Sequence, residues 1–123
     1  MTHHLPIALA LLALSPLSQA LDIEAYSPER FARLQQDNAR VSLHFHADWC
    51  PTCRAQQKVF NSWQGDPKVP GTLLVVDYDK ARDLRRQMSV RSQSTVISFQ
   101  GKEEKARLAG ETEAGGLRRV LGE

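Results

Sequence analysis

The 123-residue chain is poor in cysteine, with only two, and has no marked excess of either charge. Two cysteines cannot supply the several bridges of a disulfide-rich scaffold, and a chain of this length can bury a core without them. Sixteen basic and fourteen acidic residues give a formal net charge of +2, well mixed along the sequence. This balance predicts neither a nucleic acid nor an anionic membrane as a partner. We therefore expect one small domain whose cysteine pair serves chemistry.

The chain also lacks any hydrophobic run long enough to span a bilayer. Its longest uninterrupted run, residues 7–14, is far shorter than the roughly 20 residues that a spanning helix needs. Pro16 breaks the run, and Ser18-Gln19-Ala20 places small residues at a cleavage site. The pattern predicts a signal peptide over residues 1–20, in preference to an uncleaved anchor. Residues 21–123 would then form the mature domain, in an oxidising compartment and without a membrane span.

Strands and helices are predicted to alternate along the mature chain. Apolar spacing and turn residues predict helices over residues 28–38, 51–64, 80–88 and 112–121, and strands over residues 41–46, 72–77, 95–99 and 105–108. Such alternation implies parallel βαβ units, and the last two strands add an antiparallel hairpin. The sequence therefore predicts an α/β protein with a three-layer α/β/α sandwich and a mixed central sheet.

Both cysteines lie where the first predicted strand gives way to a helix, in the stretch His44-Phe-His-Ala-Asp-Trp-Cys-Pro-Thr-Cys-Arg54. Cys50 would precede the helix, where unpaired N–H groups and the helix dipole favour a thiolate. Cys53 would lie one turn inside the helix. The spacing predicts thiol–disulfide exchange, with Cys50 as the nucleophile and Cys53 as the resolving thiol of one redox-active pair.

At this point the chain resembles the thioredoxin family over residues 22–122. The resemblance rests on Ala47-Asp-Trp-Cys-Pro-Thr-Cys-Arg54, Val76-Asp-Tyr-Asp79, Val90-Arg-Ser-Gln-Ser-Thr95 and Gly110. The first motif is most similar to periplasmic members, such as the C-terminal domain of the membrane thiol–disulfide interchange protein. The resemblance implies a thioredoxin-like fold and a monomeric periplasmic protein-disulfide oxidoreductase that needs no cofactor. It further implies protein thiols and disulfides as substrates, action as a reductant, and an electron-transfer partner in the membrane or periplasm.

The resemblance also assigns a substrate-binding surface around the cysteines. Trp49 would offer a flat indole surface, and the two residues between the cysteines would tune the redox potential. The loop before the strand at residues 95–99 would pair with substrate backbone. The residues assigned to substrate binding are Trp49, Pro51, Thr52, Gln93, Ser94 and Thr95.

Three residues depart from the family pattern. Ser94 replaces a cis-proline, and because a non-proline cis bond costs about 3–4 kcal/mol we expect Gln93–Ser94 to be trans. If this serine perturbs substrate docking, Ser94→Pro should raise activity. His44 replaces a buried aspartate and could accept the proton of Cys53, or it could be a neutral core histidine satisfied by a backbone carbonyl. His46 stands where many members have tryptophan, and we expect it to be a packing or rim residue.

Metal binding is the competing function. His44, His46, Cys50 and Cys53 could supply two nitrogen and two sulfur ligands, a set that suits zinc or copper(I). A single C-x-x-C without a second ligand pair is a weak metal motif, so this thioredoxin-fold metal carrier remains the alternative. A non-enzymatic interaction module is a third reading, against which the intact cysteine pair argues.

Overall fold

A five-stranded mixed sheet forms the centre of the protein in a computed structural model, which describes residues 2–3 and 20–122. The elements are β1 (Asp22–Ala25), α1 (Pro28–Gln36), β2 (Arg40–His46), α2 (Pro51–Ser62), β3 (Thr72–Asp77), α3 (Arg82–Gln87), β4 (Thr95–Gln100), β5 (Glu103–Ala109) and α4 (Ala114–Leu121). The strand order is β1-β3-β2-β4-β5, with β1, β3 and β2 parallel and β4 and β5 antiparallel to their neighbours. The predicted α/β class and mixed sheet are confirmed.

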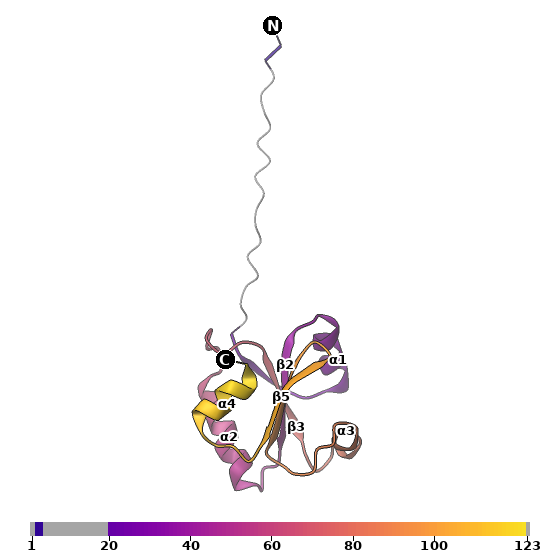
Figure 1. The fold of residues 1–123 in the computed structure, drawn as a ribbon, viewed down its shortest axis with the longest axis vertical. Coiled ribbons are helices and arrows are strands. Elements are labelled where there is room, and N and C mark those ends of the chain that lie inside the picture. The colour runs from indigo at the N-terminus through magenta and orange to yellow at the C-terminus, as the bar shows by residue number, and fades with distance from the viewer. Residues whose placement is uncertain (1, 4–19, 123) are drawn as a thin grey trace.

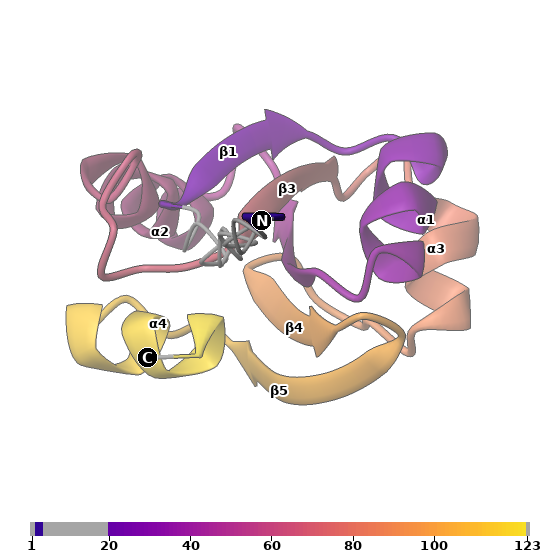
Figure 2. The same cartoon turned by 90° about the horizontal axis from the view of Figure 1, so that it is seen from above.

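Helices cover both faces of this sheet, α1 and α3 on one and α2 and α4 on the other (Figures 1 and 2). Each face has its own apolar core. Phe31 and Leu34 of α1 pack with β2 and β3, while Phe60 and Trp63 pack with Leu117 of α4 on the opposite face. The predicted three-layer sandwich is confirmed.

Polar and apolar residues alternate along β2, which lies in the middle of the sheet between β3 and β4. Leu43 and Phe45 point into the core beneath α1 and α3, so the residues between them point toward α2. His44 is fully buried there, with its ring 5.1 Å from that of Phe60. The strand therefore has no solvated polar face: it is a central strand with a buried histidine.

The sequence prediction missed β1. Its four residues, Asp22-Ile-Glu-Ala25, are short and half polar, and they form a strand because they pair in parallel with β3 at the edge of the sheet. The chain order therefore begins with a strand, and the cysteines follow the second strand, not the first as predicted.

The start of α3 also differs from the prediction. The helix begins at Arg82 instead of residue 80, and no side chain caps its N-terminus. The carboxylate of Asp79 accepts a hydrogen bond from Trp49, while Asp77 Oδ1 accepts the backbone N–H groups of Asp79 and Lys80 at 3.1 and 3.3 Å. The turn after β3 thus connects to the cysteine motif.

The predicted signal peptide, residues 1–20, lies almost entirely outside the described residues. Leu21 has 1% of its surface exposed and packs in the core beneath α2 and α4. No helix in the described part of the chain is both long and apolar enough to cross a membrane.

Candidate active site

Cys50 is the N-cap of α2. Its extended backbone ends the preceding loop, and its Sγ accepts the backbone N–H of Cys53 at 3.2 Å. Pro51 occupies the first helical position, where its missing N–H costs no hydrogen bond. The sulfur therefore lies at the positive end of the helix, which favours a thiolate.

Cys53 lies one turn further along α2 and is fully buried. Burial and a hydrogen bond to Cys50 raise the pKa of the Cys53 thiol well above its ordinary value, although the backbones of Ala47 and Ser94 act in the opposite direction. Its Sγ is also 3.9 Å from the carbonyl oxygen of Phe45. Both cysteines are free, and the raised pKa of Cys53 keeps its thiol protonated near neutral pH.

Ser94 lies beside the cysteines in an unusual backbone conformation. The Gln93–Ser94 bond is trans, as expected, but Ser94 has φ +61°, a left-handed value that non-glycine residues rarely adopt. Three hydrogen bonds hold it: its N–H donates to Phe45 O at 2.9 Å, and its carbonyl accepts from Gln56 Nε2 at 3.0 Å and from Gly110 N at 3.1 Å. The loop is thus fixed without the proline of the family pattern.

The other residues assigned to substrate binding border the same site. Trp49 is 59% exposed, and its indole Nε1 donates to Asp79 Oδ2 at 2.7 Å, which fixes an apolar ring at the surface. Thr52 is half-buried in the first turn of α2. On the other side of the cysteines, Gln93 is half-buried, and Thr95 begins β4 with its hydroxyl donating to Ser92 O at 2.8 Å.

Comparisons with known proteins assign the chain to a family. The model of the family described as Thioredoxin matches residues 22–123. The chain belongs to the thioredoxin family. Thioredoxin of Mycoplasmoides gallisepticum is 34% identical over 68 residues, which are 55% of this chain and 67% of that protein. Thiol–disulfide oxidoreduction is therefore the activity of this chain.

Solved structures agree with the assignment. The structure of Trxlp from Edwardsiella tarda has a TM-score of 0.76 and 30% identity, and the match covers 81% of this chain and 98% of that one. Thioredoxin of Malassezia sympodialis has a TM-score of 0.69 at 18% identity, over 98% and 96% of the two chains, and thus shares the fold.

His44 lies beneath this site, but its partners are glutamines. Its Nε2 is 2.9 Å from Gln56 Oε1 and its Nδ1 is 3.1 Å from Gln57 Oε1. Burial lowers the pKa of His44 to about 4, against the smaller opposing effect of these two hydrogen bonds. The ring is therefore neutral near pH 7 and satisfied by side-chain amides, where the sequence suggested a backbone carbonyl. Its role as proton acceptor for Cys53 stays a prediction.

Gln56 is a residue of the site that the sequence reasoning missed. It is fully buried, and its amide nitrogen donates both to Ser94 O and to Glu111 O, at 3.0 and 2.9 Å. It thereby ties α2 to the loops before β4 and α4. Its position three residues after Cys53 and four before Phe60 was the available signal, because that spacing puts a glutamine on the buried face of α2.

The ligand set for zinc or copper is not assembled. No group of three or more histidine, cysteine or acidic residues within residues 20–122 has an arrangement that could hold a metal ion. The ring of His44 faces Gln56 and Gln57, while His46 Nε2 is 2.9 Å from Asp48 Oδ1. The metal-carrier reading is therefore not supported.

Proposed function

We propose that the protein is an exported thioredoxin that reduces disulfide bonds of protein substrates in the periplasm. The observation that carries the reducing direction is the environment of Cys53. Among thiol–disulfide oxidoreductases, the strong oxidants are those in which the dithiol form is stabilised relative to the disulfide form. Here burial raises the pKa of the Cys53 thiol, and the histidine beneath the pair is neutral near pH 7, so it adds no positive charge that would stabilise thiolates.

The reaction uses the two sulfurs in turn. The Cys50 thiolate attacks one sulfur of a substrate disulfide, whose S–S bond breaks and releases a thiolate that takes up a proton. Cys53 loses its proton and attacks Cys50 Sγ, which breaks the mixed disulfide and releases the second substrate thiol. The substrate gains two electrons and the protein is left with a Cys50–Cys53 disulfide. A dithiol electron donor must then reduce that disulfide before the next turnover.

Trapping tests the exchange itself. Cys53→Ser should accumulate mixed disulfides with exported proteins through Cys50, because the resolving thiol is absent. A variant with both Cys50→Ser and Cys53→Ser is the matched control and should trap nothing. If Cys53→Ser traps no partner and the wild-type protein fails to reduce insulin, the proposal is wrong.

The reduction potential tests the direction. A value near about −270 mV is expected for a reductant, whereas a value near about −120 mV would identify an oxidant. The measurement uses glutathione or dithiothreitol redox buffers, with the Cys50–Cys53 pair followed by alkylation. An oxidising value would overturn the reducing role and leave the exchange activity in place.

Export is supported by the signal-peptide pattern of residues 1–20. The folded domain begins where that pattern ends, with Ala20 bridged to Pro70 and Leu21 buried. In a Gram-negative host the full chain should appear in the periplasm with Leu21 as its first residue, as read by mass spectrometry. A chain that begins at Leu21 behind an initiator methionine is the control and should stay in the cytoplasm. Retention of an uncleaved full chain in the cytoplasm would contradict the proposal.

A further inference from the structure

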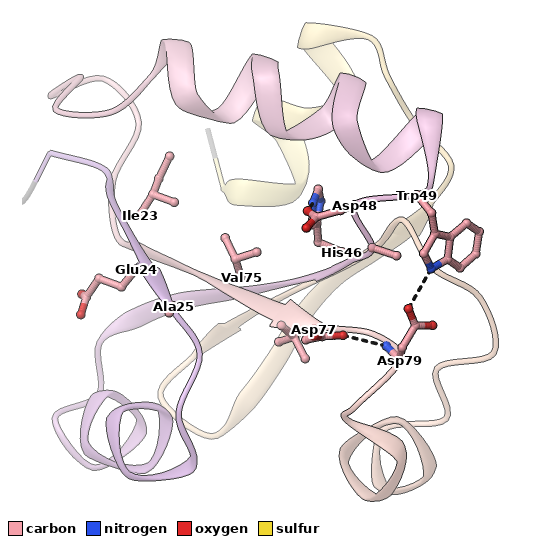
Figure 3. Close-up of a pocket in the computed structure, with 11 residues that line it drawn as sticks. Ile23, Glu24, Ala25, His46, Asp48, Trp49, Val75, Asp77 and Asp79 are labelled. Carbon is pink, nitrogen blue, oxygen red and sulfur yellow. Dashed lines mark hydrogen bonds and ion pairs between the residues drawn. The ribbon is translucent and has the colours of Figure 1, made fainter.

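A pocket of about 580 Å³ lies next to Trp49, on the side of the site formed by β1, β3 and the end of β2. Neither cysteine is among the residues that line it, yet Ala47, Asp48 and Trp49 belong both to its wall and to the redox motif. Figure 3 shows the pocket between Ile23 and Val75 on one side and the carboxylates that follow β2 and β3 on the other. It is a hollow beside the cysteine motif, with an apolar side and a polar side.

The pocket contains His46, which stands where the family resemblance expects the larger ring of tryptophan. The side chain of His46 is 14% exposed, and its Nε2 lies 2.9 Å from Asp48 Oδ1. Because a carboxylate only accepts hydrogen bonds, Nε2 donates in this contact. The other ring nitrogen, Nδ1, is buried and has no hydrogen-bond partner among the described residues. His46 therefore offers neither ring nitrogen to a ligand, and the polar groups left for one are the carboxylates of the pocket.

The charges of the pocket indicate a cationic ligand. Four carboxylates line it, and none of its lining residues is lysine or arginine. Arg30 pairs with Glu24 at 3.0 Å and offsets that charge, which leaves Asp48, Asp77 and Asp79. Asp48 is fully exposed, and Asp77 and Asp79 accept hydrogen bonds only from uncharged N–H groups. The polar wall thus presents hydrogen-bond acceptors and net negative charge.

We propose that this pocket binds a lysine or arginine side chain of the protein substrate and so selects substrates with a basic residue near the reacting cysteine. The cationic head would lie among Asp48, Asp77 and Asp79, and the apolar stem against Ile23 and Val75. Trp49 lines the pocket and directly precedes Cys50 in the chain. We therefore place the basic residue roughly two to four positions from the substrate cysteine, at about 3.3 Å per extended residue. The proposal rests on disulfide exchange, but on neither export nor the reducing direction.

Matched peptides test the proposal. Three disulfide-linked peptides differ only in arginine, leucine or glutamate three positions from the cysteine, and kcat/KM is measured for each. The wild-type protein should prefer arginine to glutamate by about tenfold at low salt, and the ratio should approach about twofold in about 0.5 M NaCl because salt screens exposed charges. Equal rates for the three peptides at low salt would overturn the proposal.

Two pocket variants and one control variant test whether the preference for arginine arises in the pocket. Asp48→Asn removes an exposed carboxylate and should lower the arginine-to-glutamate ratio about threefold. His46→Trp should fill the pocket and bring the ratio close to one. Glu103→Gln removes an equal charge at the opposite end of the sheet and should leave the ratio unchanged. A preference that survives both pocket variants, or that falls equally in Glu103→Gln, would place the selection elsewhere.

Binding without exchange separates this proposal from the proposed function. The same peptides with serine in place of cysteine cannot react, and calorimetry measures their dissociation constants. Arginine should again bind tighter than glutamate, and His46→Trp should remove the difference. If all three reactive peptides turn over slowly but the serine peptides bind selectively, the proposed activity is wrong and the pocket proposal stands. If the peptides turn over rapidly but the serine peptides bind without selectivity, only the pocket proposal is wrong.

Discussion

His44 offers a direct test of how the buried side of the site is held together, because its neutral ring is enclosed within the central strand. Burial lowers its pKa from an ordinary 6.5 to about 4. Between these values the unfolded chain binds a proton that the folded chain does not, so stability rises with pH in this range. The contribution is complete above about pH 6.5 and is lost as the pH falls toward about 4.

The size of the effect follows from the same two values. Relative to neutral pH, protonation of the unfolded chain removes about 2 kcal/mol of stability at about pH 5 and about 3 kcal/mol near about pH 4. A loss of this size is a large fraction of the stability of a small domain. Mild acid should therefore destabilise the fold before most of the carboxylates are protonated.

Urea denaturation at about pH 7 and about pH 5 measures the loss at constant ionic strength. His44→Gln abolishes the titration and should lower the difference between the two pH values by about 2 kcal/mol. His46→Gln is the control, because it removes a histidine from the same strand and leaves His44 in place. Carboxylates titrate in all three proteins and cancel in the comparison. If wild type and His44→Gln lose equal stability between the two pH values, the buried neutral ring is refuted.

Three other substitutions test the loop that faces the cysteines. Ser94→Pro should lower the free energy of unfolding by about 3 kcal/mol, because proline has a negative φ and no N–H to donate to Phe45. Ser94→Gly should be neutral or stabilising by about 1 kcal/mol, because glycine adopts a positive φ without strain. Denaturation that finds Ser94→Pro as stable as wild type would contradict the positive φ. The expectation that Ser94→Pro raises activity stays a prediction, and insulin reduction by the same variant tests it. Gln56→Leu should cost about 3 kcal/mol, since it leaves buried groups of His44 and Glu111 unpaired; wild-type stability would show that this amide is dispensable.

The redox motif could be predicted from the sequence because its chemistry is local. Cys50 and Cys53 are three residues apart at a strand-to-helix junction, and both the cap and the direction of the first turn follow from that spacing. The helices and the apolar strands were found for the same reason, since their periodicity lies within a short window. The element β1 was missed because its four residues form a strand only through pairing with β3, fifty residues along the chain.

The environment of the motif could not be predicted, because it depends on contacts between distant segments. The partners of His44 come from α2, and the left-handed backbone of Ser94 depends on acceptors and donors from β2, α2 and Gly110. The pocket beside Trp49 is lined by residues of β1, β2 and β3 and by the loops that follow β2 and β3, which no local pattern brings together.

The two departures from the family pattern beneath and opposite the cysteines are joined by one side chain. The NH₂ of Gln56 is committed to the carbonyls of Ser94 and Glu111, so its oxygen must face His44, and His44 Nε2 must carry the hydrogen. The ring nitrogen Nδ1 then accepts, which requires Gln57 to turn its amide nitrogen toward it. Because Gln57 Nε2 donates to Asn61 Oδ1 at 2.9 Å, the amide of Asn61 must turn in step. An aspartate at this place would set a carboxylate against the Gln56 oxygen. The histidine supplies the donor that lets Gln56 hold the serine loop, so His44 and Ser94 belong to one hydrogen-bonded arrangement centred on Gln56.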